Sequence, residues 1–231
     1  MTEHQHHADT QTPRRTFLGH VAAGVAALAG LGAVPARLLG ERRRGFGGAH
    51  LADDWMDALT GKHRTVFDMS AHKNGKPLTQ AKNYLDAWRD AFTVSERDLN
   101  LVIGIHGEGI PVVLTDALWT RFRIGEQYGV VDGGTKTAGV RNVFTTMHAV
   151  GGGLVNSDQT VETLQGRGVR FLVCMNTIAG ATKKLAAAGL GTPEEIRPAL
   201  LNGLLPGVIV VPSMVVTFTQ LQERDVAYVT A

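Results

Sequence analysis

Short apolar runs alternate with longer segments of helical character from about residue 64 to the end of the chain, and this alternation constrains the fold most. The clearest run covers residues 99–105 and reads Leu-Asn-Leu-Val-Ile-Gly-Ile. Such near-continuous runs are typical of strands that are buried on both faces of a parallel sheet. Shorter runs predict four further strands, at residues 64–69, 169–174, 208–211 and 227–229.

The segments between these runs have the spacing of helices. One apolar face recurs through Ala81, Tyr84, Leu85, Trp88 and Phe92. Further helices are predicted over residues 116–128, 161–165, 177–188, 193–201 and after Ser213. Strands joined by helices imply right-handed crossovers between parallel neighbours. We therefore expect an α/β fold with three layers, α/β/α, around a mostly parallel five-stranded sheet.

The domain limits follow from local composition. Residues 37–61 are rich in arginine and glycine and are interpreted as a linker, with a short helix expected near residues 51–59. Residues 62–231 then form a single domain, since the sequence shows no internal repeat and no second core. The glycine-punctuated segment 130–158 fits the alternation less well, and we interpret it as an insertion or a long functional loop.

The first 36 residues have the order of an export signal. A polar start leads to Arg14 and Arg15, then to Phe17 and Leu18, and a weakly apolar stretch at 20–34 precedes a small-residue cleavage site. This pattern resembles a twin-arginine signal peptide. It implies a periplasmic or otherwise exported protein that meets the membrane only through this segment. An uncleaved N-terminal anchor is the alternative.

The composition limits the classes of function. The chain has 231 residues, a net charge of +2 and no basic stripe interleaved with aromatics, so a nucleic-acid partner is not expected. Its single cysteine, Cys174, excludes an intramolecular disulfide. P-loop, GxGxxG and GxSxG patterns are missing, which argues against nucleotide cofactors and serine hydrolysis. We therefore predict no cofactor.

Cys174 is the leading candidate for a reactive group. In an open parallel sheet, ligands bind beyond the carboxyl ends of the strands, and Cys174 ends the third predicted strand just before a helix expected from Thr177. The positive end of that helix stabilises a thiolate, which is the nucleophilic form. A buried structural cysteine is the alternative. Asn176 and Thr177, directly after Cys174, and Glu108, after the second strand, are candidates for ligand contacts; a solvated carboxylate is the alternative for Glu108.

His106 follows the strand at residues 99–105 and is expected at the same edge of the sheet. Near the thiol it could orient a substrate or assist proton transfer, and a purely structural hydrogen bond is the alternative. His148, in the segment 130–158, could join His106 and Cys174 in a metal site. No short-spacing motif such as CxxC or HxxxH supports that site, so none is predicted.

Several segments are similar to one family. Residues 168–177, Gly-Val-Arg-Phe-Leu-Val-Cys-Met-Asn-Thr, resemble the cysteine strand of DsrE/DsrF-like (YchN-like) proteins. Residues 102–107, with a strand ending in His-Gly, and the C-terminal segments 205–212 and 221–229 are similar to the same family. The resemblance implies a parallel α/β/α fold and a trimer or hexamer. In some members the matching cysteine carries sulfur as a persulfide between partner proteins, which would make Cys174 the sulfur acceptor here.

Two hypotheses therefore stand after the sequence. The first is an exported sulfur carrier, or a sulfurtransferase-like protein at most, that acts through Cys174, with His106 as a second catalytic residue and a donor or acceptor protein as its partner. The second is a non-catalytic oligomeric module that binds a small ligand or a metal in the cleft at the strand ends. The position of Cys174 favours the first hypothesis.

Overall fold

The computed structural model describes residues 54–149 and 151–231. The predicted signal segment 1–36, with Arg14, Arg15, Phe17 and Leu18, lies outside the described residues, as does most of the predicted linker. Within the described part of the chain, no helix combines the length and the apolar character needed to cross a membrane.

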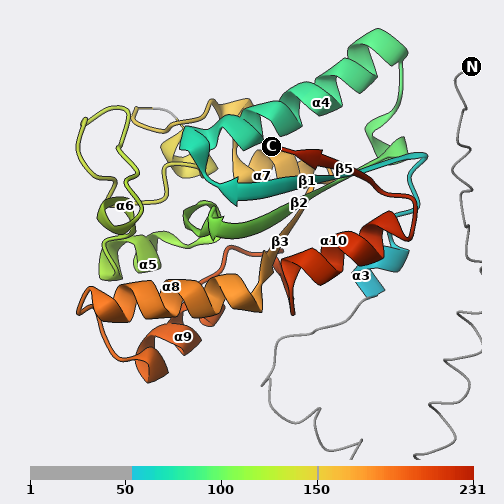
Figure 1. Cartoon of the computed structure of the whole chain (residues 1–231). Coiled ribbons are helices and arrows are strands. Elements are labelled where there is room, and N and C mark those ends of the chain that lie inside the picture. Colours follow the sequence, from blue (N-terminus) through green and yellow to red (C-terminus); the bar gives the residue numbers. More distant parts are fainter. Residues whose placement is uncertain (1–53, 150) are drawn as a thin grey trace, which may run out of the picture. The chain divides into compact units, whose positions relative to one another are not determined.

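The domain is built on a five-stranded sheet in the order β4-β3-β2-β1-β5, and every pair of neighbours is parallel. The strands are β1 (His63–Ala71), β2 (Leu99–Glu108), β3 (Arg170–Cys174), β4 (Ile209–Val211) and β5 (Ala227–Thr230). The chain lays down β1 to β4 side by side and then returns to place β5 on the other side of β1 (Figure 1). The predicted α/β class, with three layers and a five-stranded parallel sheet, is confirmed.

Helices connect the strands, as predicted. The α-helices are α3 (Asp54–Asp57), α4 (Lys76–Phe92), α5 (Asp116–Arg121), α6 (Ile124–Gln127), α7 (Val161–Gly166), α8 (Met175–Ala187), α9 (Pro193–Asn202) and α10 (Met214–Gln222). Short 3-10 turns are η3 (Lys73–Gly75), η4 (Glu96–Asp98), η5 (Ile110–Val113), η6 (Thr146–His148) and η7 (Ser157–Gln159). Figure 1 shows α8 and α9, which pack on each other, near the end of the sheet where the strands finish.

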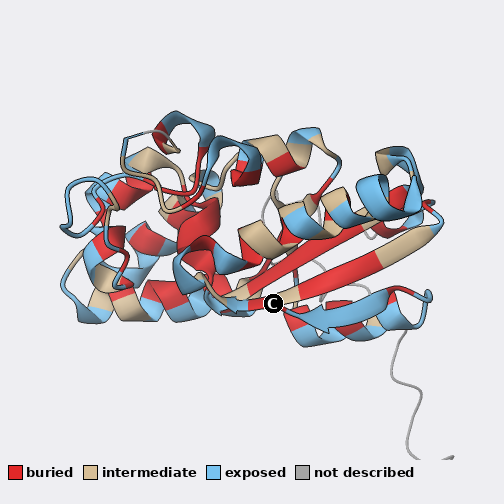
Figure 2. Ribbon diagram, turned by 90° about the horizontal axis from the view of Figure 1, so that it is seen from above, coloured by how far each residue is buried: buried red, intermediate tan, exposed pale blue. Residues whose placement is uncertain are grey.

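Successive side chains along each strand point to opposite faces of the sheet, and the two faces form two separate hydrophobic cores. Phe67 and Leu101 lie in the larger one, which joins the sheet to α4 and α7 and extends to α8 and α9. Their sequence neighbours Val66 and Val102 lie in the smaller one, under α10. α4 and α10 are therefore on opposite sides of the sheet (Figure 1), and the central strands are buried on both faces, whereas the edge strand β5 is exposed (Figure 2).

Two predicted helices differ in the structure. The helix predicted over 116–128 is two helices, α5 and α6, because Arg123 has a left-handed backbone with a φ of 47°. This break lets Phe122 and Ile124, on either side of Arg123, both become fully buried. Phe92, predicted on the apolar face of α4, is 66% exposed because α4 ends at this residue, where its last turn extends past the core.

The segment 130–158 has no α-helix among its described residues and is held by buried polar contacts instead of regular structure. Asn142 is fully buried; its Nδ2 donates to three carbonyl oxygens of residues 111–114 at 2.7–3.3 Å, and its Oδ1 accepts the N–H of Phe144 at 2.9 Å. Val143 and Phe144 lie in the larger core. This part of the segment is therefore an integral part of the domain.

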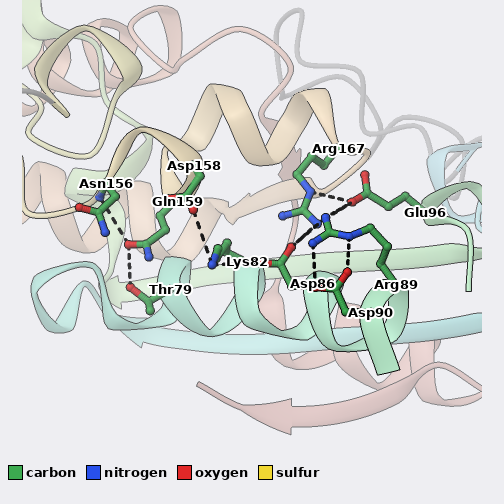
Figure 3. A network of polar contacts seen from close by, with 10 residues as sticks. All are labelled: Thr79, Lys82, Asp86, Arg89, Asp90, Glu96, Asn156, Asp158, Gln159 and Arg167. Carbon is green, nitrogen blue, oxygen red and sulfur yellow. Dashed lines mark hydrogen bonds and ion pairs between the residues drawn. The ribbon is translucent and has the colours of Figure 1, made fainter. Parts of the chain in front are cut away.

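A polar network joins α4 to the end of α7 and to η4 (Figure 3). Arg167, whose side chain is 16% exposed, donates to Asp86 Oδ1 at 2.8 Å and through Nε to Glu96 Oε1 at 2.9 Å. Lys82 adds a second ion pair to Asp86 at 3.0 Å. Burial opposes ionisation of Asp86, but the hydrogen bonds from Lys82 and Arg167 outweigh it, so the pKa of Asp86 lies below its ordinary value.

Replacing Arg167 by methionine is expected to lower the free energy of unfolding by about 1–2 kcal/mol near neutral pH. Because the pKa of Asp86 is lowered in the folded state, the ion pairs stabilise the fold above the pKa of the unfolded carboxyl. Their contribution is lost as the pH falls through the folded value. Urea unfolding of both proteins at about pH 7 and about pH 2.5 should therefore show a difference that shrinks in acid.

The matched control is Arg123→Met, because the pair of Arg123 with Glu126 is more than half exposed on both sides. This change is expected to alter the free energy of unfolding by no more than about 0.5 kcal/mol. An Arg167 variant that is as stable as the control variant, or a loss that is the same at both pH values, would contradict the role given to the network.

Candidate functional site

A cavity of about 410 Å³ lies at the carboxyl ends of β2 and β3, between α8 and the first turn of α10. In a parallel sheet this is the edge at which ligands bind. The cavity is lined by His106, Gly107, Glu108, Tyr128, Cys174, Asn176, Thr177, Gly180, Ala181, Lys184, Ser213, Met214 and Val215. All five residues that the sequence singled out as catalytic or ligand-binding therefore line one cavity.

Cys174 is the last residue of β3 and the N-cap of α8. The helix begins at Met175, two residues earlier than predicted, because the thiol itself caps it in place of a polar turn. The backbone N–H of Thr177 donates to Cys174 Sγ at 3.4 Å, and Thr177 Oγ1 lies 3.1 Å from the sulfur. Cys174 is only 2% exposed, so a reagent reaches it through the cavity alone. Donors at a helix N-terminus favour negative charge on this sulfur.

His106 lies within β2, which continues to Glu108, rather than just after the strand as predicted. Its Nε2 is 2.6 Å from Asp68 Oδ1, and the His106 side chain is 34% exposed. Asp68 is not among the site residues predicted from the sequence. The signal was an acidic residue among the buried apolar residues Val66, Phe67 and Met69 of β1, at a position that shares a face with His106.

Tyr228, in β5, is a second residue that the sequence analysis missed. Its hydroxyl donates to Asp68 Oδ2. This hydrogen bond, together with burial, raises the pKa of Tyr228. The Phe218 ring packs edge-on against the rings of both His106 and Tyr228, with centroids 6.4 and 5.3 Å apart. An aromatic side chain on α10 thus closes one side of the Asp68 and His106 pair.

Glu108 and Asn176, the two most exposed of the predicted ligand contacts, behave differently in the structure. The Glu108 carboxylate pairs with Lys184 at 3.0 Å, and Lys184 Nζ lies 4.1 Å from the centroid of the Tyr128 ring. Burial, aided by the charge of Glu108, raises the pKa of the Tyr128 hydroxyl, which therefore stays neutral. Asn176 is exposed at the rim and has no such partner among the described hydrogen bonds. Lys184 is the cation of this cavity that the sequence analysis overlooked.

His148 does not line the cavity with His106 and Cys174. Its Nε2 is 2.8 Å from Asp116 Oδ2, and its side chain is 8% exposed, so it helps to fasten the segment 130–158. The alternative metal site built from these three residues is therefore not assembled. Across residues 54–149 and 151–231, no group of three or more His, Cys, Asp or Glu side chains is placed to hold a metal ion.

Comparisons with known proteins assign no family to the chain. No family model matches the chain, and no curated protein matches it. Among solved structures, the chain is similar to the protein of unknown function MTH1491 from Methanobacterium thermoautotrophicum, with a TM-score of 0.40 and 20% sequence identity. The match covers 73% of this chain and 99% of that one. Nothing about activity follows from a likeness at this level.

Proposed function

We propose that this chain is an exported DsrE-like sulfur carrier that holds sulfur as a persulfide on Cys174. The observation that carries the proposal is the position of Cys174 Sγ, which accepts the Thr177 N–H at the start of α8 and faces the cavity that His106 also lines. A thiolate is the nucleophile in sulfur exchange, and the start of a helix stabilises it. The resemblance of residues 168–177 to the cysteine strand of the family supports the same assignment.

The chemistry needs only a small donor that contains a sulfur–sulfur bond. Cys174 Sγ, as thiolate, attacks the outer sulfur of inorganic tetrasulfide, the bond behind that sulfur breaks, and trisulfide leaves with the electron pair. The product is a Cys174 persulfide anion, and no external oxidant or reductant is required. A cavity of about 410 Å³ has room for such a donor and for the added sulfur.

The remaining parts of this proposal rest on the sequence. The twin-arginine pattern at Arg14 and Arg15 supports export to the periplasm. The family resemblance supports a homo-oligomer, trimer or hexamer, and a partner protein that gives or takes the sulfur. Equilibrium sedimentation of the purified protein tests the oligomer directly, and a monomer at all concentrations would remove that part of the proposal.

The test of sulfur carriage is the intact mass of the protein after treatment with inorganic tetrasulfide and removal of the excess. The expected result is a gain of one sulfur mass that is lost on reduction with dithiothreitol. Because Cys174 is the single cysteine of the chain, Cys174→Ser should show no gain. A variant that still gains the mass, or a wild-type protein that gains none, would refute the proposal.

A non-catalytic binding module is the second candidate, and the 2% exposure of Cys174 favours it. In that case the cavity holds a small ligand, and the thiol is a core residue that caps α8. This candidate predicts a slow reaction of Cys174 with iodoacetamide. It also predicts a bound species in native mass spectrometry that survives purification; an empty protein with a fast-reacting thiol would exclude it.

A further inference from the structure

Four side chains form a row across neighbouring strands on the α10 side of the sheet. Asp68 in β1 is level with Gly104 in β2, and Ile105 is level with Val173 in β3. Extending this register by one residue puts His106 level with Cys174, on neighbouring strands that run about 4.8 Å apart. Because side chains alternate along a strand, Asp68, His106 and Cys174 all project to the same face.

The fourth member of the row comes from the edge strand. Tyr228 in β5 is level with Val66 in β1, two residues before Asp68, and therefore shares its face. The order across β5, β1, β2 and β3 is thus Tyr228, Asp68, His106 and Cys174. The first three are joined by hydrogen bonds, from Tyr228 to Asp68 Oδ2 and between Asp68 Oδ1 and His106 Nε2 at 2.6 Å.

These bonds orient the His106 ring. A carboxylate only accepts hydrogen bonds, so the contact with Asp68 favours Nε2 as the donor and leaves Nδ1 as the ring nitrogen that can take up a proton. Among the hydrogen bonds of the described residues, none uses His106 Nδ1. The other charged groups that line the cavity, Glu108 and Lys184, pair with each other. His106 is thus the basic group that lines the same cavity as the Cys174 thiol, which is 2% exposed and has little access to bulk base.

We propose that Asp68 and Tyr228 are positioning residues that hold His106 as the base for the Cys174 thiol, an inference that rests on the proposed sulfur carriage. The hydrogen bonds of Cys174 Sγ in this structure go to Thr177, so the thiol gives its proton to His106 Nδ1 across the cavity that both residues line, and the resulting thiolate attacks the outer sulfur of the donor. The donor's sulfur–sulfur bond breaks, the shorter polysulfide leaves with the electron pair, and it takes the proton from His106. Tyr228 restrains Asp68 through its second oxygen, and Asp68 restrains the imidazole ring.

The test is the rate of Cys174 modification by two reagents, inorganic tetrasulfide and iodoacetamide, as a function of pH. At about pH 7, Asp68→Asn and His106→Gln should each react at least about tenfold more slowly than the wild type, and the double variant should be no slower than His106→Gln alone. Tyr228→Phe should react about threefold more slowly than the wild type, since it removes one hydrogen bond to Asp68. At about pH 10, where thiols ionise without help, all the rates should converge.

Asp98→Asn, an exposed carboxylate outside the row, is the matched control and should react like the wild type. The urea midpoint of every variant shows whether the fold is kept. If Asp68→Asn unfolds, Tyr228→Phe and Asp68→Glu still test the row. Asp68→Glu keeps a carboxylate and should therefore react faster than Asp68→Asn. Wild-type rates in Asp68→Asn at about pH 7 would overturn the inference, as would a deficit that persists at about pH 10.

The two reagents separate this inference from the proposed function. Alkylation by iodoacetamide requires only an ionised thiol, so it tests the row even if no sulfur is taken up. A thiol that alkylates with the expected dependence on Asp68 but gains no sulfur would support the row and refute sulfur carriage. Uptake of sulfur at the same rate in the wild type and in Asp68→Asn would support carriage and refute the row, and a thiol inert to both reagents would overturn both.

Discussion

Replacing Asn142 by aspartate is expected to lower the free energy of unfolding by about 4 kcal/mol at neutral pH, because it puts a carboxylate among buried carbonyl oxygens. The Asn142 Nδ2 atom donates to three carbonyls of residues 111–114 at 2.7–3.3 Å, and the side chain is fully buried. A carboxylate has the same shape but no hydrogen to donate, so all three contacts become repulsive. Burial disfavours its charged form, which raises the pKa of the introduced carboxyl in the folded state.

The raised pKa of the introduced carboxyl also sets how the stability of Asn142→Asp depends on pH. A carboxyl whose pKa is higher in the folded state destabilises the protein above its unfolded pKa, and the penalty shrinks as the pH falls towards about 4. Urea unfolding at about pH 7 and about pH 4 measures both values. Asn156→Asp is the matched control, because Asn156 is an exposed N-cap and aspartate caps as well as asparagine. An Asn142 variant no less stable than this control would mean that residues 130–158 are not anchored through Asn142.

Replacing Gly125 by alanine is expected to lower the free energy of unfolding by about 3 kcal/mol or more, because Gly125 is in close backbone contact with the segment 130–158. A Cβ at Gly125 would lie 2.1 Å from the carbonyl oxygen and 2.5 Å from the nitrogen of Gly139, on the segment that crosses α6. These are backbone atoms, so no side chain can turn away to make room. Either α6 or the crossing segment has to move, and the buried contacts around it are lost.

Gly166→Ala is the matched control for this change, since Gly166 is also helical and a Cβ there meets nothing within 4 Å. Alanine is the better helix former by about 1 kcal/mol, so this variant should be as stable as the wild type or slightly more stable. Thermal or urea unfolding should therefore show a clear loss of stability for Gly125→Ala and no loss for Gly166→Ala. A mild effect at Gly125 would show that the contact between Gly125 and Gly139 is looser than the structure has it.

The sheet could be predicted from the sequence because its signal is local. Runs such as residues 99–105 are too apolar for any position except a buried parallel strand, and the helices between them fix the crossovers. The start of α9 could be predicted for the same reason, since its signal is the capping box that Thr192 and Glu195 form. The break at Arg123 was not predictable, because it depends on which neighbouring side chains the core can bury, and this is decided by tertiary packing.

Only part of the candidate site could likewise be predicted from the sequence. Cys174, His106 and Glu108 could be placed near one another because they lie at the carboxyl ends of two neighbouring strands of one parallel sheet. Asp68 and Tyr228 could not, because β5 pairs with β1 only after the chain has crossed the whole sheet, and their contact depends on that register. The roles of the five predicted site residues stay predictions until the thiol is assayed.

The central claim is that Cys174 carries a sulfur atom that it can pass on, and cyanolysis tests it most directly. The protein is treated with inorganic tetrasulfide, freed of excess reagent and exposed to cyanide, which removes the outer sulfur of a persulfide as thiocyanate and returns the thiolate. The account predicts one thiocyanate and one recovered thiol per chain in the wild type, and neither in Cys174→Ser. No thiocyanate from the wild type, or an equal amount from Cys174→Ser, would contradict it.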